Sequence, residues 1–81
     1  MECDLHGYEL VEAIIEVQQA LDECQLIEDN LLEIIHGYSH GSILRDYFRS
    51  EQFLIEMSKN GYELKKIDFP NPGKTRYLIK R

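Results

Sequence analysis

The sequence predicts an α+β domain: a two-layer βαβαββ sandwich in which a four-stranded mixed sheet carries two main helices on one face. Residues 9–26 place apolar side chains every three or four positions, which is typical of a surface helix. A short apolar segment lies on each side of this helix and ends in a His-Gly pair, so the first 37 residues read as a βαβ unit. Two more apolar segments near the end, separated by a turn with two prolines and a glycine, predict a hairpin.

The first helix and the strand after it show different apolar patterns. One apolar face of the helix over 9–26 is formed by Leu10, Ile14, Val17, Leu21 and Cys24. The next segment, Leu31 to Ile35, has apolar residues on both faces, as expected for a central parallel strand. Parallel strands joined by a right-handed crossover bring their carboxyl ends to one edge of the sheet, where open α/β sheets tend to bind ligands.

A second amphipathic helix is expected next, with Ser39 or Ser42 as its N-cap. Ser50 is expected to break it, and a further helical stretch over 53–60 ends in an Asn-Gly pair, which tolerates the left-handed conformation that stops a helix. The last two strands follow, around 62–67 and 77–79. Their hairpin makes the final strand antiparallel, and if it fills a gap beside the second strand the sheet order is 1-2-4-3.

Size and composition favour one domain over residues 1–81, because a chain of this length buries only about 60 to 65 % of its unfolded surface in one modest core. No apolar run approaches the roughly 18 residues of a membrane span, and the acidic start is the reverse of a signal peptide. We therefore expect a cytoplasmic protein with no membrane partner and leave its oligomeric state open. Cys3 and Cys24 lack a Cys-x-x-Cys spacing and read as reduced, buried small hydrophobic residues.

The charge is unevenly distributed along the chain. The net charge of −6 argues against strong, indiscriminate binding of nucleic acid. Residues 1–58 hold thirteen acidic and two basic side chains, whereas residues 59–81 hold seven basic and two acidic ones. Two interpretations stay open: a solvated acidic helix beside basic edge strands, or a phosphate-facing surface formed by the last two strands with Arg45 and Arg49.

The strand-end histidines are the candidate catalytic residues. A pair of imidazoles, His6 and His36, can supply the base and the acid that phosphodiester cleavage requires near neutral pH. Asp4 lies two residues before His6, hence on the same side of the strand at about 6.6 Å, and could orient the imidazole. On the residues alone, a structural role for Asp4 and His6 is favoured, because most histidines are not catalytic.

The loop over 36–41 leads into a helix N-terminus, which favours an anion such as phosphate. The alternative interpretation of this loop is a tight strand-to-helix turn with no ligand. Arg45 and Arg49 lie four residues apart on one helical face and could clamp phosphate or pair with acidic neighbours. Tyr8 and Tyr38 each follow a motif glycine and could stack on bases or cover the core.

A divalent metal such as Mg²⁺ or Mn²⁺ is a less favoured possibility. His36, His40, His6 and Asp4 could be its ligands, but the stretch from His36 to His40 is a loop. RNA cleavage needs no metal because the 2′-hydroxyl is an internal nucleophile, whereas DNA nicking usually needs a metal-activated water. A histidine site therefore leans towards RNA.

Motifs around both histidines carry a family resemblance. The pattern Leu-Asp-x-His-Gly is matched by Cys3, Asp4, Leu5, His6 and Gly7, with Cys3 where an aliphatic residue is usual. The pattern His-Gly-x-Gly-x-Gly with an early Leu-Arg is matched by His36, Gly37, Gly41, Leu44 and Arg45, with Ser39 in place of the middle glycine. A weaker third match is Gly73 with Thr75. These are motifs of the Smr (small MutS-related) domain, which the chain resembles from Cys3 to about Ile79.

The Smr resemblance implies a fold similar to the C-terminal domain of translation initiation factor 3 and a nucleic-acid-directed domain, often with endonuclease or nicking activity on DNA or RNA. It implies Asp4, His6 and His36 as catalytic residues. The expected nucleic-acid-binding residues are Gly37, Gly41, Ser42, Arg45, Arg49, Lys74 and Arg76. The alternatives are a non-catalytic nucleic-acid-binding module and a protein-interaction module that uses the acidic helix over 9–26. Weak, salt-sensitive binding is expected if nucleic acid is the partner.

Overall fold

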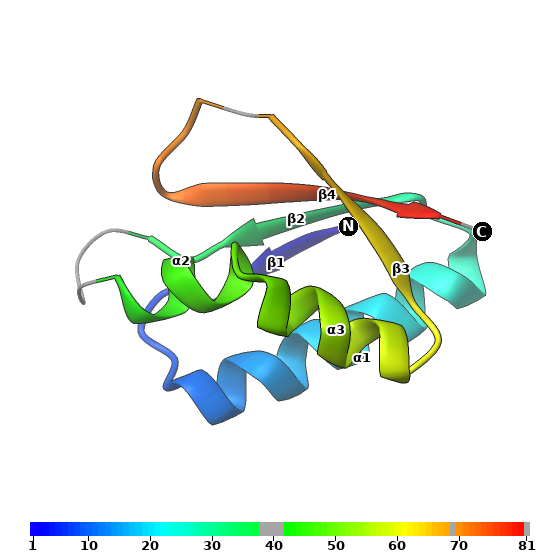
Figure 1. Ribbon diagram of the computed structural model, residues 1–81, viewed down its shortest axis with the longest axis horizontal. Helices are drawn as coiled ribbons and strands as arrows, with labels where there is room; N and C mark the ends of the chain where they lie inside the picture. Colours follow the sequence, from blue (N-terminus) through cyan, green and yellow to red (C-terminus); the bar gives the residue numbers. More distant parts are fainter. Residues whose placement is uncertain (38–41, 69, 81) are drawn as a thin grey trace.

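The computed structural model describes residues 1–37, 42–68 and 70–80 (Figure 1). Its elements in chain order are β1 (Glu2–Asp4), α1 (Leu10–Ile27), β2 (Leu31–Ile35), α2 (Ile43–Phe48), α3 (Glu51–Lys59), β3 (Glu63–Ile67) and β4 (Lys74–Lys80). The predicted βαβαββ succession is confirmed. The second helical region is divided into α2 and α3 at the expected position, because Ser50 is the N-cap of α3 and its hydroxyl accepts a hydrogen bond from the amide of Phe53.

The four strands form one mixed sheet in the order β1-β2-β4-β3, as the hairpin argument predicted. β1 pairs parallel with β2, and Asp4 lies opposite Ile35. β4 lies antiparallel to both β2 and β3 and fills the gap between them. The parallel pair places the carboxyl ends of β1 and β2 at one edge, which is the edge that carries both histidines.

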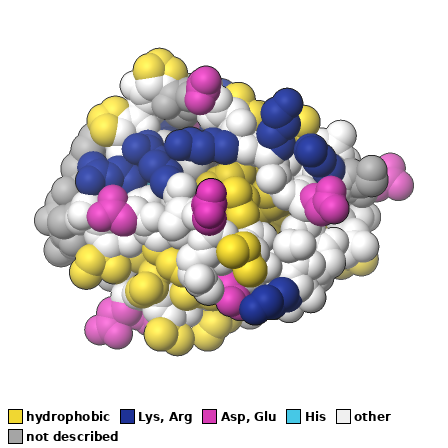
Figure 2. All heavy atoms as spheres, viewed as in Figure 1, with side chains coloured by type: hydrophobic (Ala, Val, Ile, Leu, Met, Phe, Trp, Pro, Cys, Tyr) yellow, Lys and Arg dark blue, Asp and Glu magenta, His cyan; other side chains and the backbone are white. Residues whose placement is uncertain are grey.

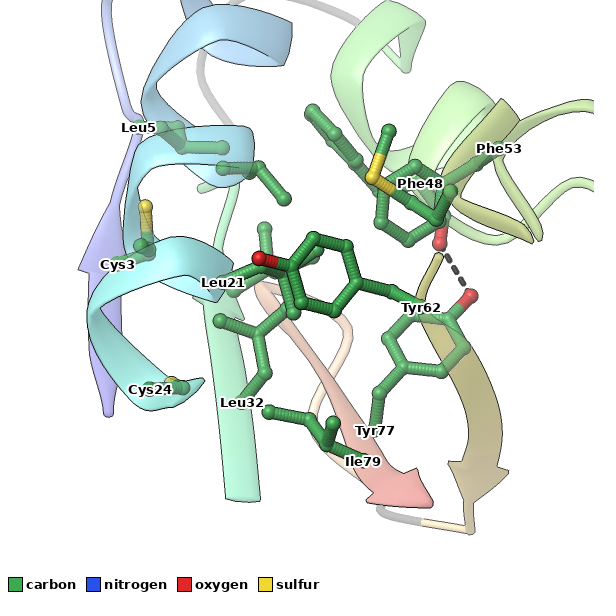
Figure 3. Packing of buried hydrophobic residues seen from close by; sticks show 14 of the residues in the cluster. Cys3, Leu5, Leu21, Cys24, Leu32, Phe48, Phe53, Tyr62, Tyr77 and Ile79 are labelled. Atoms are coloured by element: carbon green, nitrogen blue, oxygen red, sulfur yellow. Dashed lines mark hydrogen bonds between the residues drawn. The ribbon is translucent and has the colours of Figure 1, made fainter. Parts of the chain in front are cut away.

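All three helices cover the same face of the sheet (Figure 1). Burial along β4 alternates accordingly: Thr75, Tyr77 and Ile79 point into the core, whereas the residues between them point away. Figure 3 shows the core between the two layers, where Tyr77 packs against the ring of Phe53 in α3 and donates a hydrogen bond to the carbonyl of Phe48 in α2. This packing fixes β4 against the helices and so fixes the position of Thr75 near the histidine edge.

The ends of the helices follow local sequence rules, with one correction. Glu9 and Glu12 form a reciprocal capping box at the start of α1. Ser42 is the N-cap of α2, which confirms one of the two predicted positions, but its side chain makes no capping hydrogen bond. Ser39, the other candidate, lies outside the described residues.

Both cysteines are buried and neither forms a disulfide, as predicted. Burial raises the pKa of the Cys3 thiol to about 11, and nearby carboxylates act in the same direction. Cys3 is therefore a neutral thiol at physiological pH and behaves as a small core residue. None of the helices in the described ranges is long and apolar enough to span a membrane.

Candidate functional site

The parallel pairing of β1 and β2 continues just beyond the strands. The amide of Leu5 donates to the carbonyl of Ile35 at 2.7 Å, which places His6 beside Gly37. Gly37 has φ +73°, and a Cβ added there would lie 3.1 Å from the Cβ of His6. A side chain at position 37 would therefore be both strained and crowded, which accounts for the glycine directly after His36.

Asp4 and His6 are in direct contact at this edge. The Asp4 carboxylate oxygen Oδ1 lies 2.7 Å from Nδ1 of His6 and also accepts from the His6 amide at 3.2 Å. An ionised carboxylate can only accept hydrogen bonds, so Nδ1 carries a proton and Nε2 is the nitrogen left for other partners. The side chain of His6 is 68 % exposed, and its hydrogen bond to Asp4 lowers the pKa of that carboxyl group. The pair therefore presents an oriented imidazole to solvent.

His36 has the opposite environment. It is buried, its Nε2 lies 2.9 Å from the Thr75 hydroxyl, and its Nδ1 lies 3.4 Å from the Gly37 carbonyl. The Arg49 Nε donates to the same hydroxyl at 2.8 Å, so the hydroxyl proton is directed to Nε2, and Nδ1–H points at the carbonyl. Burial lowers the pKa of His36; the hydrogen bond to Gly37 opposes this, and the charges of Arg49 and Arg45 add to the lowering. His36 is therefore a neutral imidazole with both ring nitrogens engaged.

The imidazoles of His6 and His36 lie at the same edge of the sheet but point to opposite faces. Asp4 and His6 are exposed, on the face without helices, whereas Leu5 and His36 are buried on the helical face. The structure thus joins Asp4 to His6 and ties His36 to Thr75 and Arg49. Shared acid–base chemistry between the two histidines stays a prediction.

A cavity of about 390 Å³ opens on the helical side of this edge. It lies between the first turn of α1 and the start of α2, with His36 among its lining residues, and its apolar walls include Leu10, Ile43 and Leu44. The Gly7-Tyr8 step that follows His6 forms part of its rim. Pockets of this size are typical of small-molecule sites.

The predicted nucleic-acid-binding residues fall into separate places. Figure 2 shows Lys and Arg side chains gathered in a row over α2 and the beginning of β4. Arg45 is 41 % exposed and lies 3.5 Å from the neighbouring Asp46 carboxylate. Arg49 instead donates from Nη2 to the carbonyls of Asn71 and Lys74, as well as to Thr75, so it binds α2 to the start of β4. Gly41 lies outside the described residues.

Lys74 and Arg76 lie on the face of the sheet that no helix covers. Both form ion pairs with Glu33 of β2, at 3.3 Å and 2.6 Å. Burial alone would raise the pKa of Glu33, but the hydrogen bonds from Arg76 and Lys74 outweigh it and hold that pKa below its ordinary value. Two of the predicted phosphate-binding cations therefore share a buried carboxylate.

A family model described as the Smr domain matches residues 3–63. The chain belongs to the Smr domain family. Endonuclease MutS2 of Finegoldia magna is 33 % identical over an alignment 64 residues long, and the match covers 75 % of this chain and 8 % of that protein. The chain therefore corresponds to a small part of that relative. The crystal structure of the Smr domain of Thermus thermophilus MutS2 matches with a TM-score of 0.72 and 27 % identity, over 99 % of this chain and 98 % of that one.

Two residues of this Smr domain are not found by sequence reasoning: Thr75, which contacts His36 and Arg49 on the helical face, and Glu33, which pairs with Lys74 and Arg76 on the uncovered face. Thr75 enters the sequence patterns only as part of a weak motif, and it lies beyond the span of the family match. A hydroxyl on the core side of a strand is a weak signal, since its partners come from distant segments. Glu33 gives a clearer signal, because a carboxylate within the apolar run Leu31–Ile35 requires a cation from a neighbouring strand.

Residues 1–37, 42–68 and 70–80 contain no cluster of side chains that supports the metal hypothesis. No group of three or more His, Cys, Asp or Glu side chains in those ranges is arranged to hold a metal ion. His40, the fourth ligand drawn from the sequence, lies outside them.

The pKa of His36 should be lower in the folded protein than that of an ordinary histidine. We expect His36 to remain neutral to lower pH than an ordinary histidine, because burial and two arginines disfavour its charged form. Its unfolded-state pKa is the higher one, so its contribution to the free energy of unfolding is complete above about pH 6.5 and decreases as pH falls towards the folded pKa. Imidazole ¹⁵N chemical shifts between about pH 5 and about pH 8 measure this. A His36 that becomes charged at its ordinary pKa would contradict the hydrogen-bond assignment.

Proposed function

We propose that this Smr domain cleaves or nicks phosphodiester bonds in nucleic acid, with Asp4 and His6 as the reacting pair. The observation that supports this most is the 2.7 Å contact between Asp4 Oδ1 and His6 Nδ1 at the exposed edge. A carboxylate that fixes the tautomer of an exposed imidazole is the arrangement that general-base catalysis requires. The name MutS2 endonuclease, carried by a relative of which this chain covers only a small part, is consistent with this activity.

The chemistry follows from the free nitrogen of His6. Nε2 would take the proton of the attacking hydroxyl, and Asp4 would stabilise the imidazolium that forms. In RNA the attacking group is the 2′-hydroxyl, so an oxygen–phosphorus bond forms at the 2′ position while the bond to the 5′ oxygen breaks. Water at this open edge can return a proton to the departing 5′ oxygen. This route needs only groups that the exposed edge provides, and it favours RNA.

His36 then has a positioning role. Its ring is neutral, buried and bonded at both nitrogens, which makes it a poor proton donor at neutral pH. It lies next to Gly37, whose backbone borders His6. The contact from Arg49 through Thr75 to His36 would therefore hold the segment on which the Asp4–His6 pair rests.

The decisive experiment incubates the pure protein with labelled single-stranded RNA, single-stranded DNA and both duplexes, with and without a chelator. Cleavage of RNA in chelator, leaving 2′,3′-cyclic phosphate ends, would support the mechanism above. DNA nicking that requires Mg²⁺ or Mn²⁺ would replace it with a metal-activated water. Binding of nucleic acid without cleavage would support the non-catalytic alternative.

A protein-interaction module is the second candidate, favoured by the outer surface of α1. Val11 and Ile15, four residues apart, are exposed there, and Leu26 and Ile27 are exposed at the end of the same helix. Single exposed apolar residues are common, but four on one helix suit a protein partner. Substitutions on α1 that abolish a protein interaction and leave nucleic-acid binding unchanged would favour this candidate.

Nucleic-acid binding should depend on the cations of the uncovered sheet face. Because Lys74 and Arg76 neutralise Glu33, the three should be changed together, as Glu33→Gln, Lys74→Gln and Arg76→Gln, to avoid a stranded carboxylate. We expect weaker binding to every sequence, and a slope of log K against log salt that is smaller by about one unit for each phosphate that the protein no longer neutralises. Fluorescence anisotropy over a salt series measures both quantities.

The matched control neutralises charge on the helical layer. Glu16→Gln and Glu23→Gln lie on α1, on the other side of the sheet, and should change affinity and slope very little. Glu33→Gln alone removes a negative charge and should not weaken binding. An unchanged salt slope in the triple variant would remove this face from the binding surface.

A further inference from the structure

The cavity beside His36 has a lining that does not suit phosphate. Among the described residues that line it there is a carboxylate, Glu9, and no Lys or Arg. The positive end of α1 is already occupied, because Glu9 and Glu12 cap the helix reciprocally. A phosphate entering the cavity would meet the Glu9 carboxylate, and none of the described lining residues is a cation that would bind it, so the cavity favours an uncharged group over the phosphate backbone of a nucleic acid.

The same lining suits a flat, uncharged ring. Leu10, Ile43 and Leu44 provide apolar contact, and Tyr8 provides an aromatic ring that is 42 % exposed. His36 offers no free ring nitrogen, since Thr75 and the Gly37 carbonyl engage both. The Glu9 carboxylate can accept a hydrogen bond from an exocyclic amino group, which adenine, cytosine and guanine carry. A nucleobase satisfies each of these features.

The cavity also has the right position relative to the Asp4–His6 pair. Its rim begins at Gly7, the residue directly after His6. Gly7 has φ +82°, and a Cβ built there would meet no atom within 4 Å, so the space beside the backbone is open at this residue. A nucleic-acid strand can cross the edge over Gly7 with its phosphate at His6 and its adjacent base in the cavity.

We propose that this cavity binds one unpaired nucleobase of the nucleotide next to the phosphate at the Asp4–His6 pair. The position of the phosphate at the Asp4–His6 pair rests on the proposed function, whereas the binding of a base in the cavity does not. A base can enter the cavity only when it is neither stacked nor paired, so the domain prefers single strands, loops or ends over duplex. Bases with an exocyclic amino group bind better there than uracil or thymine.

A double-mutant cycle between protein and ligand tests the proposal. The ligands are a short single-stranded oligonucleotide and the same oligonucleotide with one abasic position, scanned along the strand. The protein change is Ile43→Ala, at a side chain that is 65 % exposed and so can be shortened with little effect on folding. We expect each change alone to weaken binding by about tenfold, the usual effect of removing one stacked base. Together they should weaken it no further, because both remove the same interaction.

The matched control is Ile55→Ala on α3, where the side chain is 50 % exposed and distant from the cavity. It should bind each oligonucleotide as tightly as the protein that carries His6→Ala alone. Methyl and ring NMR signals of Leu44 and Tyr8 should shift with the intact oligonucleotide and less with the abasic one. Independent, additive losses in the cycle would overturn the proposal, as would wild-type affinity in Ile43→Ala or no binding of any oligonucleotide at low salt.

The cycle separates this proposal from the proposed cleavage. All binding measurements use protein carrying His6→Ala, so turnover does not contribute. If the unmodified protein cleaves nothing but the cycle is non-additive, the base site stands and the proposed activity fails. If the protein cleaves RNA and the cycle is additive, the activity stands and the base site fails. A non-additive cycle with a peptide ligand in place of the oligonucleotide would assign the cavity to a protein partner and overturn the proposal of a base site.

Discussion

Replacing His6 with alanine should lower the rate of phosphodiester cleavage by about 10² or more, while affinity for the substrate stays nearly unchanged. A general base acts in the transition state, so its removal affects turnover rather than ground-state binding. The side chain is 68 % exposed, so the fold should not depend on it. Single-turnover kinetics at saturating protein give the rate, and anisotropy gives the affinity.

Asp4→Asn is the companion variant, because it keeps the size of the side chain and removes its charge. It should reduce the rate less than His6→Ala if Asp4 only orients the imidazole, and equally if Asp4 is itself a base or a metal ligand. Glu2→Gln, at another exposed acidic residue of β1, serves as the control and should leave the rate unchanged. Equal losses of binding and rate in His6→Ala would make His6 a residue that holds the ligand.

Arg49→Met should destabilise the domain by about 2–3 kcal/mol. The guanidinium donates to the Thr75 hydroxyl at 2.8 Å and to the carbonyls of Lys74 and Asn71 at 2.9 and 3.2 Å. Methionine keeps much of the side-chain volume but leaves these partly buried acceptors without a donor. In a domain of this size, the loss corresponds to a fall in Tm on the order of 10 °C, which thermal unfolding followed by circular dichroism measures.

Arg45→Met is the matched control on the same helix. Arg45 is 41 % exposed, and its 3.5 Å contact is with its own sequence neighbour, so its removal should cost less than about 0.5 kcal/mol. A stable Arg49→Met variant that loses nucleic-acid binding would reverse the assignment and return Arg49 to the phosphate-binding residues predicted from the sequence.

The sequence was sufficient for the features that depend on short-range patterns. The apolar spacing of residues 9–26 predicts α1, and the apolar run at Leu31–Ile35 predicts a central strand, because burial follows the period of the backbone. The break at Ser50 follows from local hydrogen bonding of its hydroxyl. Strand order 1-2-4-3 follows from the crossover and hairpin rules, and Asp4 and His6 lie on one side of a strand because they are two residues apart.

The sequence by itself therefore determined the elements, their order, the family and the edge that carries both histidines. Only the tertiary structure decided what each histidine can do. His6 meets a carboxylate two residues away, whereas His36 is surrounded by Thr75 and Arg49, which are 39 and 13 positions later in the chain. Hydrogen-bond partners and burial, which set the charge and orientation of an imidazole, come from segments that only the packed sheet and helices bring together.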